Sequence, residues 1–357
     1  GRVTGVQTCA LPIFLIVTLK FLKMKKLFSY FLVVMLIPAF VLTGCKDDND
    51  DITPADKGNF TTLKNYLVDQ NLEIGTILAD GWVVAPAPMV DGSGIVDVEN
   101  ECTIPDYHVF DIRGESDFNN GHIKGAINVA LTDIVTTAAD YSDKPILVVC
   151  KTGQTAGRGA MALRLSGFQA KVMKFGMSYW NTAFDLWTGK VNNFGVSNPN
   201  WVTTDGPELP TNELPQWETT STDPVEILAA NINTMLAAGE WGLISDDILA
   251  NPTAYNTYNF WKNDEEYIGL GHFVGAYQFK PINFDNINAL PAEEDTYIYC
   301  FTGQTSSFVV SYLQVLGYTN AKSILFGANR IIHDDLDAYN PIVTWHHSYD
   351  YTFEVNN

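Results

Sequence analysis

Apolar runs and amphipathic segments alternate along the chain, a pattern typical of strands followed by helices. Residues 146–149 are aliphatic without polar alternation, as in a parallel strand buried on both faces. A Gly-bearing turn follows, and then Ala160, Leu163 and Leu165 form a helical apolar stripe. Strands that alternate with helices predict an α/β fold whose parallel sheet is covered on both faces. Further strands are predicted at residues 107–112, 126–130 and 171–175, and helices at residues 61–71, 115–120 and 132–141.

The same pattern occurs a second time. Residues 297–317 read YIYCFTGQTSSFVVSYLQVLG and repeat the strand, cysteine, Thr-Gly-Gln-Thr turn and helix of residues 147–167. Cys150 and Cys300 are 150 residues apart, and the Gly-His-x-x-Gly-Ala turn at residues 121–126 recurs with that spacing. This self-similarity predicts a duplicated domain. In the second copy we predict a helix at residues 225–238 and strands at residues 258–261, 277–279, 296–300 and 323–326.

The composition divides the chain further. Five of the sixteen prolines lie at residues 194–224, among Asn, Thr and Ser, so we assign residues 196–223 to a linker. The first copy then spans residues 59–195 and the second residues 224–357. At about 150 residues per domain, this length suits two α/β domains, each a parallel sheet of about five strands flanked by helices.

The first 58 residues suggest a membrane anchor. Residues 1–23 begin GRVTGVQTCALPI, which resembles translated sequencing-adapter sequence, so fold prediction excludes them. From Met24, residues 24–44 resemble a lipoprotein signal peptide, and Cys45 would be lipidated after cleavage at Leu-Thr-Gly-Cys. An uncleaved membrane anchor is the alternative. Residues 45–58 form an acidic tether, either a plain spacer or a signal for surface export. We therefore expect a protein of the cell envelope, anchored by lipid to the outer membrane on its periplasmic or surface face.

Cys150 is the candidate for chemistry because it stands where a buried strand meets the N-terminus of a helix. The free N–H groups of residues 151–155 and the helix dipole favour an anion there and are expected to lower the pKa of the thiol. A thiolate in such a cradle is a nucleophile. The alternative is an inert core cysteine, the usual state of a lone Cys.

Several motifs together resemble the rhodanese family of sulfurtransferases, in tandem. Phe110-Asp111-Ile112-Arg113, followed by the Gly-His turn, resembles the family's first signature, and residues 150–155 resemble its six-residue active-site loop. The resemblance implies a Cys150 persulfide that moves sulfur from a small anionic donor to a thiol or cyanide acceptor, with no metal or organic cofactor. The implied loop residues are Lys151, Thr152, Gly153, Gln154 and Thr155, and Phe301, Thr302, Gly303, Gln304 and Thr305 in the second copy.

Other residues of these motifs have expected roles. Lys151 either neutralises the donor or is simply solvated, and the Thr155 hydroxyl caps the helix and can also donate to the persulfide. Asp111 and Arg113 are expected to support the loop as a partly buried ion pair, and Arg113 is also a candidate for binding the anionic donor. His122 and His272 are assigned to turn architecture.

The second copy departs from the signature, which leaves the activity of Cys300 in doubt. With a register of 150 residues, Asp111 and Arg113 correspond to Trp261 and Asn263, and Lys151 corresponds to Phe301. Phosphatases of the same fold need Arg six residues after Cys, but these positions hold Ala156 and Ser306. The sequence therefore disfavours a phosphatase.

Charge excludes some partners. The formal charge is -20, and removing residues 1–44, with five basic and no acidic residues, leaves 16 basic against 41 acidic residues, or -25. Such a chain is not expected to bind nucleic acid. The remaining cysteines after Cys45 are Cys102, Cys150 and Cys300, an odd number that disfavours a disulfide framework, and Cys102 is interpreted as a small core residue. We expect a monomer, and a non-catalytic rhodanese-like module that binds a partner or senses sulfide stays open as the second class.

Overall fold

The computed structural model describes residues 59–79, 81–86, 94–262 and 264–356. The predicted signal peptide, the lipidation site Cys45 and the acidic tether lie outside the described residues, as does Asn263. The described part of the chain contains two sheets of five strands and a short sheet of two.

The first copy contains a parallel sheet of five strands in the order β1-β5-β4-β2-β3. The central strand β4 is buried at every position, as its unbroken aliphatic sequence predicts. The strands are β1 (Val83–Val84), β2 (His108–Asp111), β3 (Ile127–Asn128), β4 (Ile146–Val149) and β5 (Ala170–Met173).

Helices connect β2, β3, β4 and β5 in turn, and further helices precede β1 and follow β5. The main one is α6 (Gln154–Leu165), which starts directly after the Cys150 turn and is almost wholly buried. The others are α2 (Asn59–Asp69), α3 (Ile74–Leu78), α4 (Glu115–Asn120), α5 (Ile134–Ala138) and α7 (Met177–Trp180), with 3-10 turns η2 (Leu131–Asp133) and η3 (Thr182–Phe184).

The second copy contains another parallel sheet of five strands, in the order β10-β8-β11-β12-β7. Strand by strand this is the order of the first sheet, so the predicted duplication and fold class are confirmed. The sequence pattern missed the short edge strands β1 and β7. The strands are β7 (Gly242–Ile244), β8 (Asn256–Asn259), β10 (Tyr277–Gln278), β11 (Thr296–Tyr299) and β12 (Ala321–Leu325).

The main helix of the second copy repeats that of the first. Helix α11 (Gln304–Val315) follows the Cys300 turn and has the same length as α6, 12 residues. The others are α8 (Pro224–Ala237), α9 (Asp246–Ala250), α10 (Asp264–Gly269), α12 (Ala328–Ile331) and α13 (His333–Tyr339), with 3-10 turns η4 (Pro252–Ala254), η5 (Ile287–Ala289) and η6 (Pro341–Val343).

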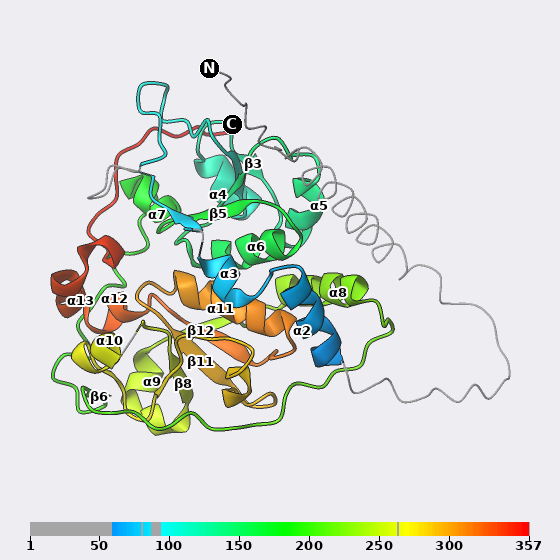
Figure 1. Ribbon diagram of the computed structural model, residues 1–357. Helices are drawn as coiled ribbons and strands as arrows, with labels where there is room; N and C mark the ends of the chain where they lie inside the picture. The colour runs from blue at the N-terminus through cyan, green and yellow to red at the C-terminus, as the bar shows by residue number, and fades with distance from the viewer. Residues whose placement is uncertain (1–58, 80, 87–93, 263, 357) are drawn as a thin grey trace, which may run out of the picture. The chain divides into compact units, whose positions relative to one another are not determined.

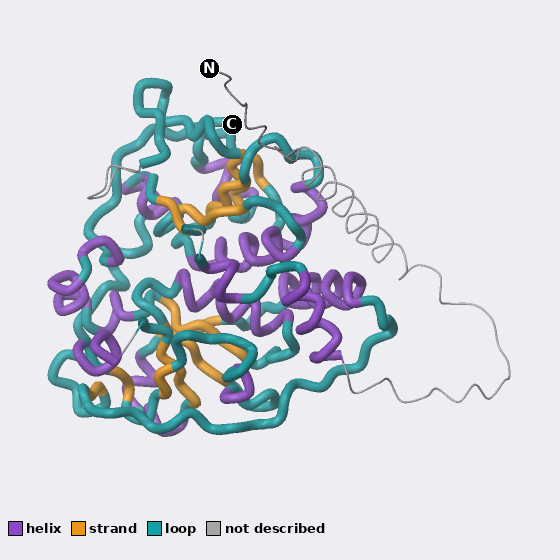
Figure 2. Tube along the Cα trace, in the orientation of Figure 1, coloured by secondary structure: helices purple, strands orange, loops and turns teal. Residues whose placement is uncertain are grey.

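Helices α6 and α11 pack against each other between the two sheets (Figures 1 and 2). Gly157 permits this approach, because a Cβ there would lie 3.2 Å from the Phe308 nitrogen and 3.2 Å from the Ser307 hydroxyl. The Ser307 hydroxyl uses the gap to donate to the Gln154 carbonyl across the interface, at 2.7 Å. The two helices that begin at the cysteine loops are therefore in direct contact.

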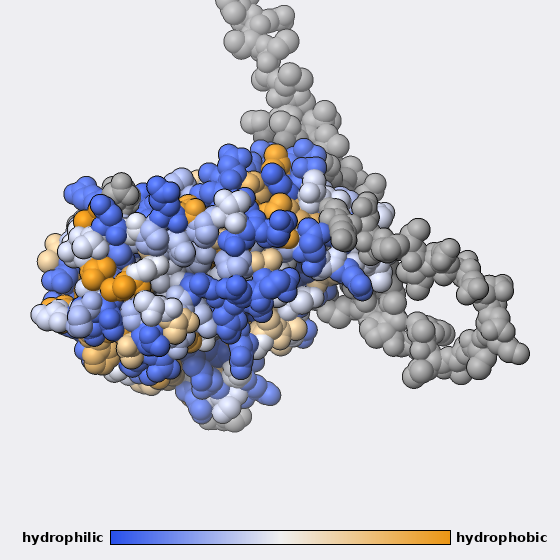
Figure 3. All heavy atoms as spheres, turned by 90° about the horizontal axis from the view of Figure 1, so that it is seen from below, coloured by the Kyte–Doolittle hydropathy of each residue, from blue (hydrophilic) through white to orange (hydrophobic). Residues whose placement is uncertain are grey.

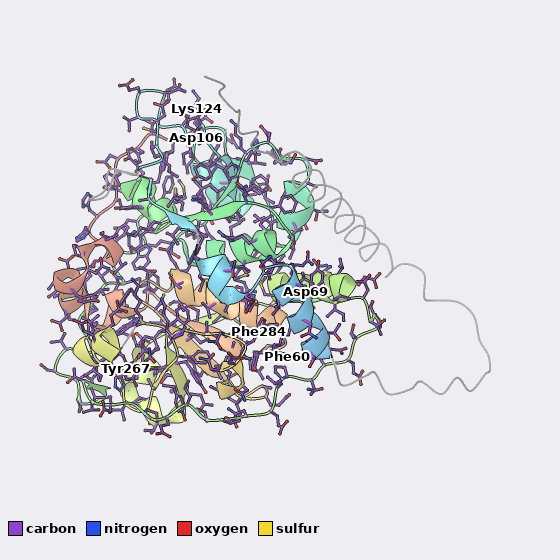
Figure 4. All side chains as sticks on the ribbon, viewed as in Figure 1. Phe60, Asp69, Asp106, Lys124, Tyr267 and Phe284 are labelled. Atoms are coloured by element: carbon purple, nitrogen blue, oxygen red, sulfur yellow. The ribbon has the colours of Figure 1, made fainter. Side chains whose placement is uncertain are left out.

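Segments of each copy also pack on the other copy, which the predicted boundaries did not include. Helix α2 packs on α8, and its Phe60 lies edge-on to Tyr318 beside the second sheet (Figure 4). At the other end of the chain, the Glu354 and Tyr349 amides donate to the His122 and Tyr179 carbonyls, both at 2.9 Å.

The predicted linker is partly ordered as strand. Residues Trp201–Val202 form β6, which pairs antiparallel with β9 (His272–Phe273). Trp201 packs on Phe273 and Trp261, and burial of these rings holds the segment despite its prolines.

The surface is largely polar. On the face in Figure 3, hydrophobic residues form small separate groups among hydrophilic ones, which is ordinary for a folded chain. Among the described helices, none is long and apolar enough to cross a membrane.

Candidate functional site

The Cys150 turn, residues 150–155 (the first loop), connects the carboxyl end of β4 to α6. Gly153 is the N-cap of α6 and has a left-handed backbone, φ 79°. No side chain caps this helix, and Thr155 lies inside its first turn, so the capping role predicted for Thr155 is wrong. The reason is geometric: the helix starts at Gln154, two residues before the start that a cap at Thr155 implies, and the N-cap Gly153 tolerates the left-handed position.

The carbonyl groups of the first loop point outward and are held one after another. The Cys150 and Lys151 carbonyls accept from the Met177 and Ser178 amides at 2.9 and 3.0 Å, and the Thr152 carbonyl accepts from the Trp187 indole at 3.1 Å. Because a trans peptide places its C=O and N–H on opposite sides, anchoring the carbonyls outside directs N–H groups inward. The hydrogen bonds from neighbouring residues therefore hold the first loop as a cradle whose N–H groups point inward.

Inside the cradle, backbone amides reach the Cys150 sulfur. The Gly153 N–H lies 3.1 Å and the Ala156 N–H 3.3 Å from Sγ. Burial nevertheless raises the pKa of the Cys150 thiol, with the Asp111 carboxylate acting in the same direction, while these N–H groups oppose the shift. The predicted lowering of this pKa is thus wrong for the resting protein, because desolvation outweighs the hydrogen bonds.

An aromatic cluster lies beside the first loop, and Cys150 is buried. Cys150 is only 4% exposed. Trp187, Phe175, Tyr179, Phe326 and Trp345 form a buried cluster that includes residues of both copies. Trp187 donates to the loop, and its ring lies 4.8 Å from that of Phe175 and 4.9 Å from that of Phe326. A reagent in solvent therefore reaches the sulfur only after a local opening.

A cavity of about 190 Å³ lies beside the first loop. Lys151 and Arg113 line it together with Asp117, Asp185 and apolar side chains that include Phe184, whereas Cys150 does not. The Lys151 ammonium is 2.8 Å from Asp117, and the side chains are 52% and 43% exposed. Lys151 thus stands at the cavity in an exposed ion pair that a competing anion can replace.

Asp111 and Arg113 form a buried ion pair at the end of β2. The Arg113 Nη2 lies 2.6 Å from the Asp111 carboxylate and 2.6 Å from the Gly121 carbonyl. The Asn128 amide donates to the Asp111 and Arg113 carbonyls at 2.9 and 2.8 Å. The pair thereby connects β2, β3 and the Gly121 turn next to the cavity.

The second loop, residues 300–305, has the same backbone but different partners. Gly303 is the N-cap of α11 with φ 76°, and the Thr302 hydroxyl accepts from the Gln304 amide at 3.2 Å, while Thr305 again lies within the helix. Cys300 is 3% exposed. In the described part of the chain, the Ser306 N–H is the backbone donor that reaches its sulfur, at 3.3 Å, and the Cys300 thiol donates to the Ser306 hydroxyl oxygen at 3.5 Å.

The structure corrects the register between the copies at β2 and β8. Asp111 pairs with Val149 in the first sheet, and Asn259 pairs with Tyr299 in the second. Asn259 therefore corresponds to Asp111, and its carboxamide accepts from the Trp261 amide at 2.9 Å as Asp111 accepts from the Arg113 amide. Trp261 replaces Arg113, two residues away from the position that the 150-residue spacing implied.

In the second copy, aromatic residues stand at the positions that cations hold in the first copy. Phe301, the counterpart of Lys151, stacks on Trp261 with ring centroids 5.1 Å apart. The sequence pattern missed a separate cation, Lys280, which follows β10 and lies 4.9 Å over the Phe260 ring. Burial lowers the pKa of Lys280, while Glu266 and Cys300 act in the opposite direction. Lys280 follows a parallel strand at the carboxyl edge of the sheet, where binding sites of α/β folds lie, and this position could have marked it in the sequence as a candidate site residue.

The two histidines bond backbone carbonyls. His122 Nδ1 lies 2.9 Å from the Phe118 carbonyl oxygen, and its ring stacks on Phe118. His272 Nδ1 and Nε2 lie 2.8 Å from the Phe273 and Thr204 oxygens. Both rings therefore tie their turns to neighbouring segments.

Arg158, which follows the first loop on α6, is fully buried and directed away from it. Its guanidinium donates to the Gln314 side chain at 3.1 Å and to the Met235 and Ala238 carbonyls. Burial lowers its pKa to about 10. Arg158 thus joins α6 to α8 and α11, and it does not act on the cysteine.

Residues 96–183 match the family model described as a rhodanese-like domain, so the first copy of this chain contains a rhodanese-like domain. The match includes β2, the Gly-His turn and the Cys150 loop. The second sheet has the same strand order, so the chain carries the fold twice.

Curated relatives match a part of this chain. The uncharacterized protein YibN of Escherichia coli (strain K12) is 38% identical over 77 residues, 20% of this chain and 54% of that protein. The uncharacterized protein YqhL of Bacillus subtilis (strain 168) is 33% identical over 60 residues, 16% of this chain and 48% of that protein. The chain thus spans about half the length of the curated relatives it matches.

Solved structures were also found to be similar. A rhodanese-related protein from Thermoplasma volcanium is 23% identical with a TM-score of 0.20, covering 21% of this chain and 75% of that chain. A thiosulfate sulfurtransferase from Pseudomonas aeruginosa is 11% identical with a TM-score of 0.25, covering 84% of this chain and 49% of that chain.

Proposed function

We propose that this protein is a sulfurtransferase in which Cys150 carries sulfane sulfur as a persulfide. The observation that carries the proposal is the cradle: the Gly153 and Ala156 N–H groups converge on Cys150 Sγ from a loop whose carbonyls are anchored outside. Such donors stabilise negative charge on sulfur in a site that excludes water. The rhodanese-like domain around the loop supports this reaction class.

The proposed reaction has two displacements. The Cys150 thiolate attacks the outer sulfur of thiosulfate, the S–S bond of the donor breaks, and sulfite leaves with the electron pair. The terminal sulfur of the resulting Cys-S-S⁻ is then attacked by a thiophilic acceptor such as cyanide, which leaves as thiocyanate and restores the thiolate. Charge and atoms balance in both steps, with no other oxidant or reductant.

Lys151 is proposed to capture the donor. It is the cation at the cavity whose carboxylate partner is exposed, so a dianion can displace Asp117 from it. Arg113 instead stays bonded to Asp111, because breaking that buried pair leaves an uncompensated charge. Because Cys150 is buried and does not line the cavity, the donor must then reach its sulfur through a local opening of the site.

A non-catalytic module that binds a partner or senses sulfide is the second candidate. The observation that favours it is the burial of Cys150 and Cys300, 4% and 3% exposed, together with the raised pKa of the Cys150 thiol. A neutral, enclosed thiol reacts slowly. The cradle still favours the enzyme, since a merely structural cysteine needs no N–H donors aimed at its sulfur.

We also propose that Cys45 anchors the protein to the cell envelope through lipid. This rests on the sequence Leu-Thr-Gly-Cys after a short apolar segment that follows Lys25 and Lys26. The two folded copies would then face the periplasm or the cell surface, where sulfane donors are dissolved anions.

The test is a mass spectrum of the protein after incubation with thiosulfate across a series of pH values. We expect a mass gain of one sulfur on the Cys150 peptide and none there in Cys150→Ser. Because the pKa of the thiol is raised, its rate of formation should increase about tenfold per pH unit from neutral pH up to that pKa. Absence of the sulfur adduct at every pH, with thiosulfate and with polysulfide, would favour the binding module.

A further inference from the structure

Each cysteine loop carries a buried glutamine that reaches across to the other copy. Gln154 and Gln304 are both 2% exposed. The Gln154 side-chain oxygen accepts from the Phe326 amide at 2.7 Å, and the Gln304 side-chain oxygen accepts from the Phe175 amide at 3.4 Å. These phenylalanines, Phe175 and Phe326, occupy equivalent left-handed positions, φ 56° and 64°, each before a glycine that packs on its own copy's loop. The glutamines are therefore reciprocal contacts between the two sites.

The second copy also holds the last carbonyls of the first loop. The Gln304 side-chain amide donates to the Gly153 carbonyl at 3.3 Å, and the Ser307 hydroxyl donates to the Gln154 carbonyl at 2.7 Å. The carbonyls of residues 150–152 are anchored within the first copy, so Gln304 and Ser307 extend that anchoring through residue 154. A carbonyl held outside fixes its peptide plane and keeps the neighbouring N–H directed inward.

The anchored stretch lies between the two donors of the cradle. Gly153 and Ala156 supply the N–H groups on Cys150 Sγ, and the two carbonyls held by the second copy belong to Gly153 and Gln154. Gly153 also permits the approach, because a Cβ there would collide with the Gln304 side-chain amide. The conformation of the first loop thus depends on contacts from α11.

We infer that the second copy acts as a positioning element for the first site, with Gln304 and Ser307 as positioning residues that keep the first loop closed on Cys150. The inference deepens the proposed function and rests on it for turnover alone. The second copy, which departs from the family signature, would then have a role that does not require chemistry at Cys300.

The experiment compares Gln304→Ala, Gln304→Glu and Ser307→Ala with a matched control, Tyr312→Phe, in the full chain. Tyr312 is on the same helix, and its hydroxyl donates to the Leu72 carbonyl at 3.1 Å, so the control also removes one long-range hydrogen bond from α11. The first readout needs no sulfur donor: the pH midpoint of iodoacetamide alkylation at the Cys150 peptide, followed by mass spectrometry. The second is the rate of persulfide formation from thiosulfate.

We expect Gln304→Ala to raise the alkylation midpoint by about half to one pH unit, since a loosened cradle stabilises the thiolate less. Its maximal persulfide rate should fall about tenfold with little change in the thiosulfate concentration at half-saturation. Ser307→Ala should change both in the same direction by less, and Tyr312→Phe should change neither. Ser307→Ala keeps the test available if Gln304→Ala does not fold.

Gln304→Glu provides a signature that a packing role cannot produce. An ionised carboxylate at this position cannot donate to the Gly153 carbonyl, whereas a protonated carboxyl group can. The ratio of variant to wild-type persulfide rate should therefore rise as the pH falls through the titration of the introduced carboxyl group. Midpoints in the Gln304 and Ser307 variants equal to that of Tyr312→Phe would overturn the inference. If wild type forms no persulfide, the proposed function fails, and the midpoints alone still decide the inference.

Discussion

The two cysteine loops have the same backbone and different surroundings. In both, Cys directly follows a buried strand, a left-handed Gly is the N-cap, and a helix of 12 residues follows. Two backbone N–H groups donate to the Cys150 sulfur, while one backbone N–H donates to the Cys300 sulfur and the Cys300 thiol itself donates to the Ser306 hydroxyl oxygen. The repeated backbone is thus not sufficient to make the two sites chemically equivalent.

The larger difference lies around the loops. The first copy places a buried ion pair and an exposed lysine beside its loop, and the second places Asn259, Trp261 and Phe301 at those positions. Stacked rings stabilise the second loop by packing and offer little to an anion. Under the two proposals above, the first copy captures a donor and the second supports its neighbour.

The largest expected effect separates the two cysteines. Cys150→Ser should abolish thiosulfate:cyanide sulfurtransferase activity, because the serine hydroxyl cannot form the persulfide, whereas Cys300→Ser should retain most of it. The measurement is thiocyanate production at saturating thiosulfate. Equal losses in the two variants would refute the comparison and would point to Lys280 as the cation that serves Cys300.

The next effect concerns the residues at the ends of β2 and β8. Arg113→Leu leaves the Asp111 carboxylate buried and uncompensated, so the free energy of unfolding should fall by about 3–5 kcal/mol. Adding Asp111→Asn, which imitates Asn259, should restore much of that loss. Chemical denaturation followed by Trp fluorescence measures both.

The matched control is Lys322→Met in the second copy. It breaks the 2.8 Å ion pair with Asp295, whose side chain is 47% exposed, and should cost less than about 1 kcal/mol. An Arg113→Leu cost as small as that of the control would show that the buried pair does not support the first site.

The smallest effect tests donor capture. Lys151→Phe gives the first loop the residue of the second, and the kcat/KM for thiosulfate should fall by about three- to tenfold, since the lost cation is half exposed and screened. The alkylation midpoint of Cys150 should stay unchanged, because Lys151 does not contact the sulfur. Lys171→Gln, on β5, removes the same charge elsewhere and should leave kcat/KM unchanged. A difference between the two lysine variants that persists at high salt would contradict an electrostatic role for Lys151.

Local patterns predicted much of the fold. The buried strand at residues 146–149, the glycine turn and the helix after it recur at a spacing of 150 residues, and β4, β11, α6 and α11 form there. These elements follow from apolar runs and glycine positions, which act over a few residues. The edge strands β1 and β7, with two and three residues, are too short to produce such a pattern.

Part of the candidate site could not be predicted from the sequence. Spacing identified Cys150 and its loop residues, but it aligned Asp111 with Trp261, because it cannot show which residues pair across a sheet. It also could not show that Gln304 contacts the first loop, since the two are brought together only when α6 packs on α11.

The amino-acid sequence by itself thus determined the duplication, the α/β class and the position of the two cysteine loops, because these depend on local periodicity and backbone preference. Only the tertiary structure decided the state of the Cys150 thiol. Its pKa depends on the balance between backbone N–H groups that lower it and burial that raises it, and burial is set by how the chain packs around the first loop. That packing exists only in the folded chain.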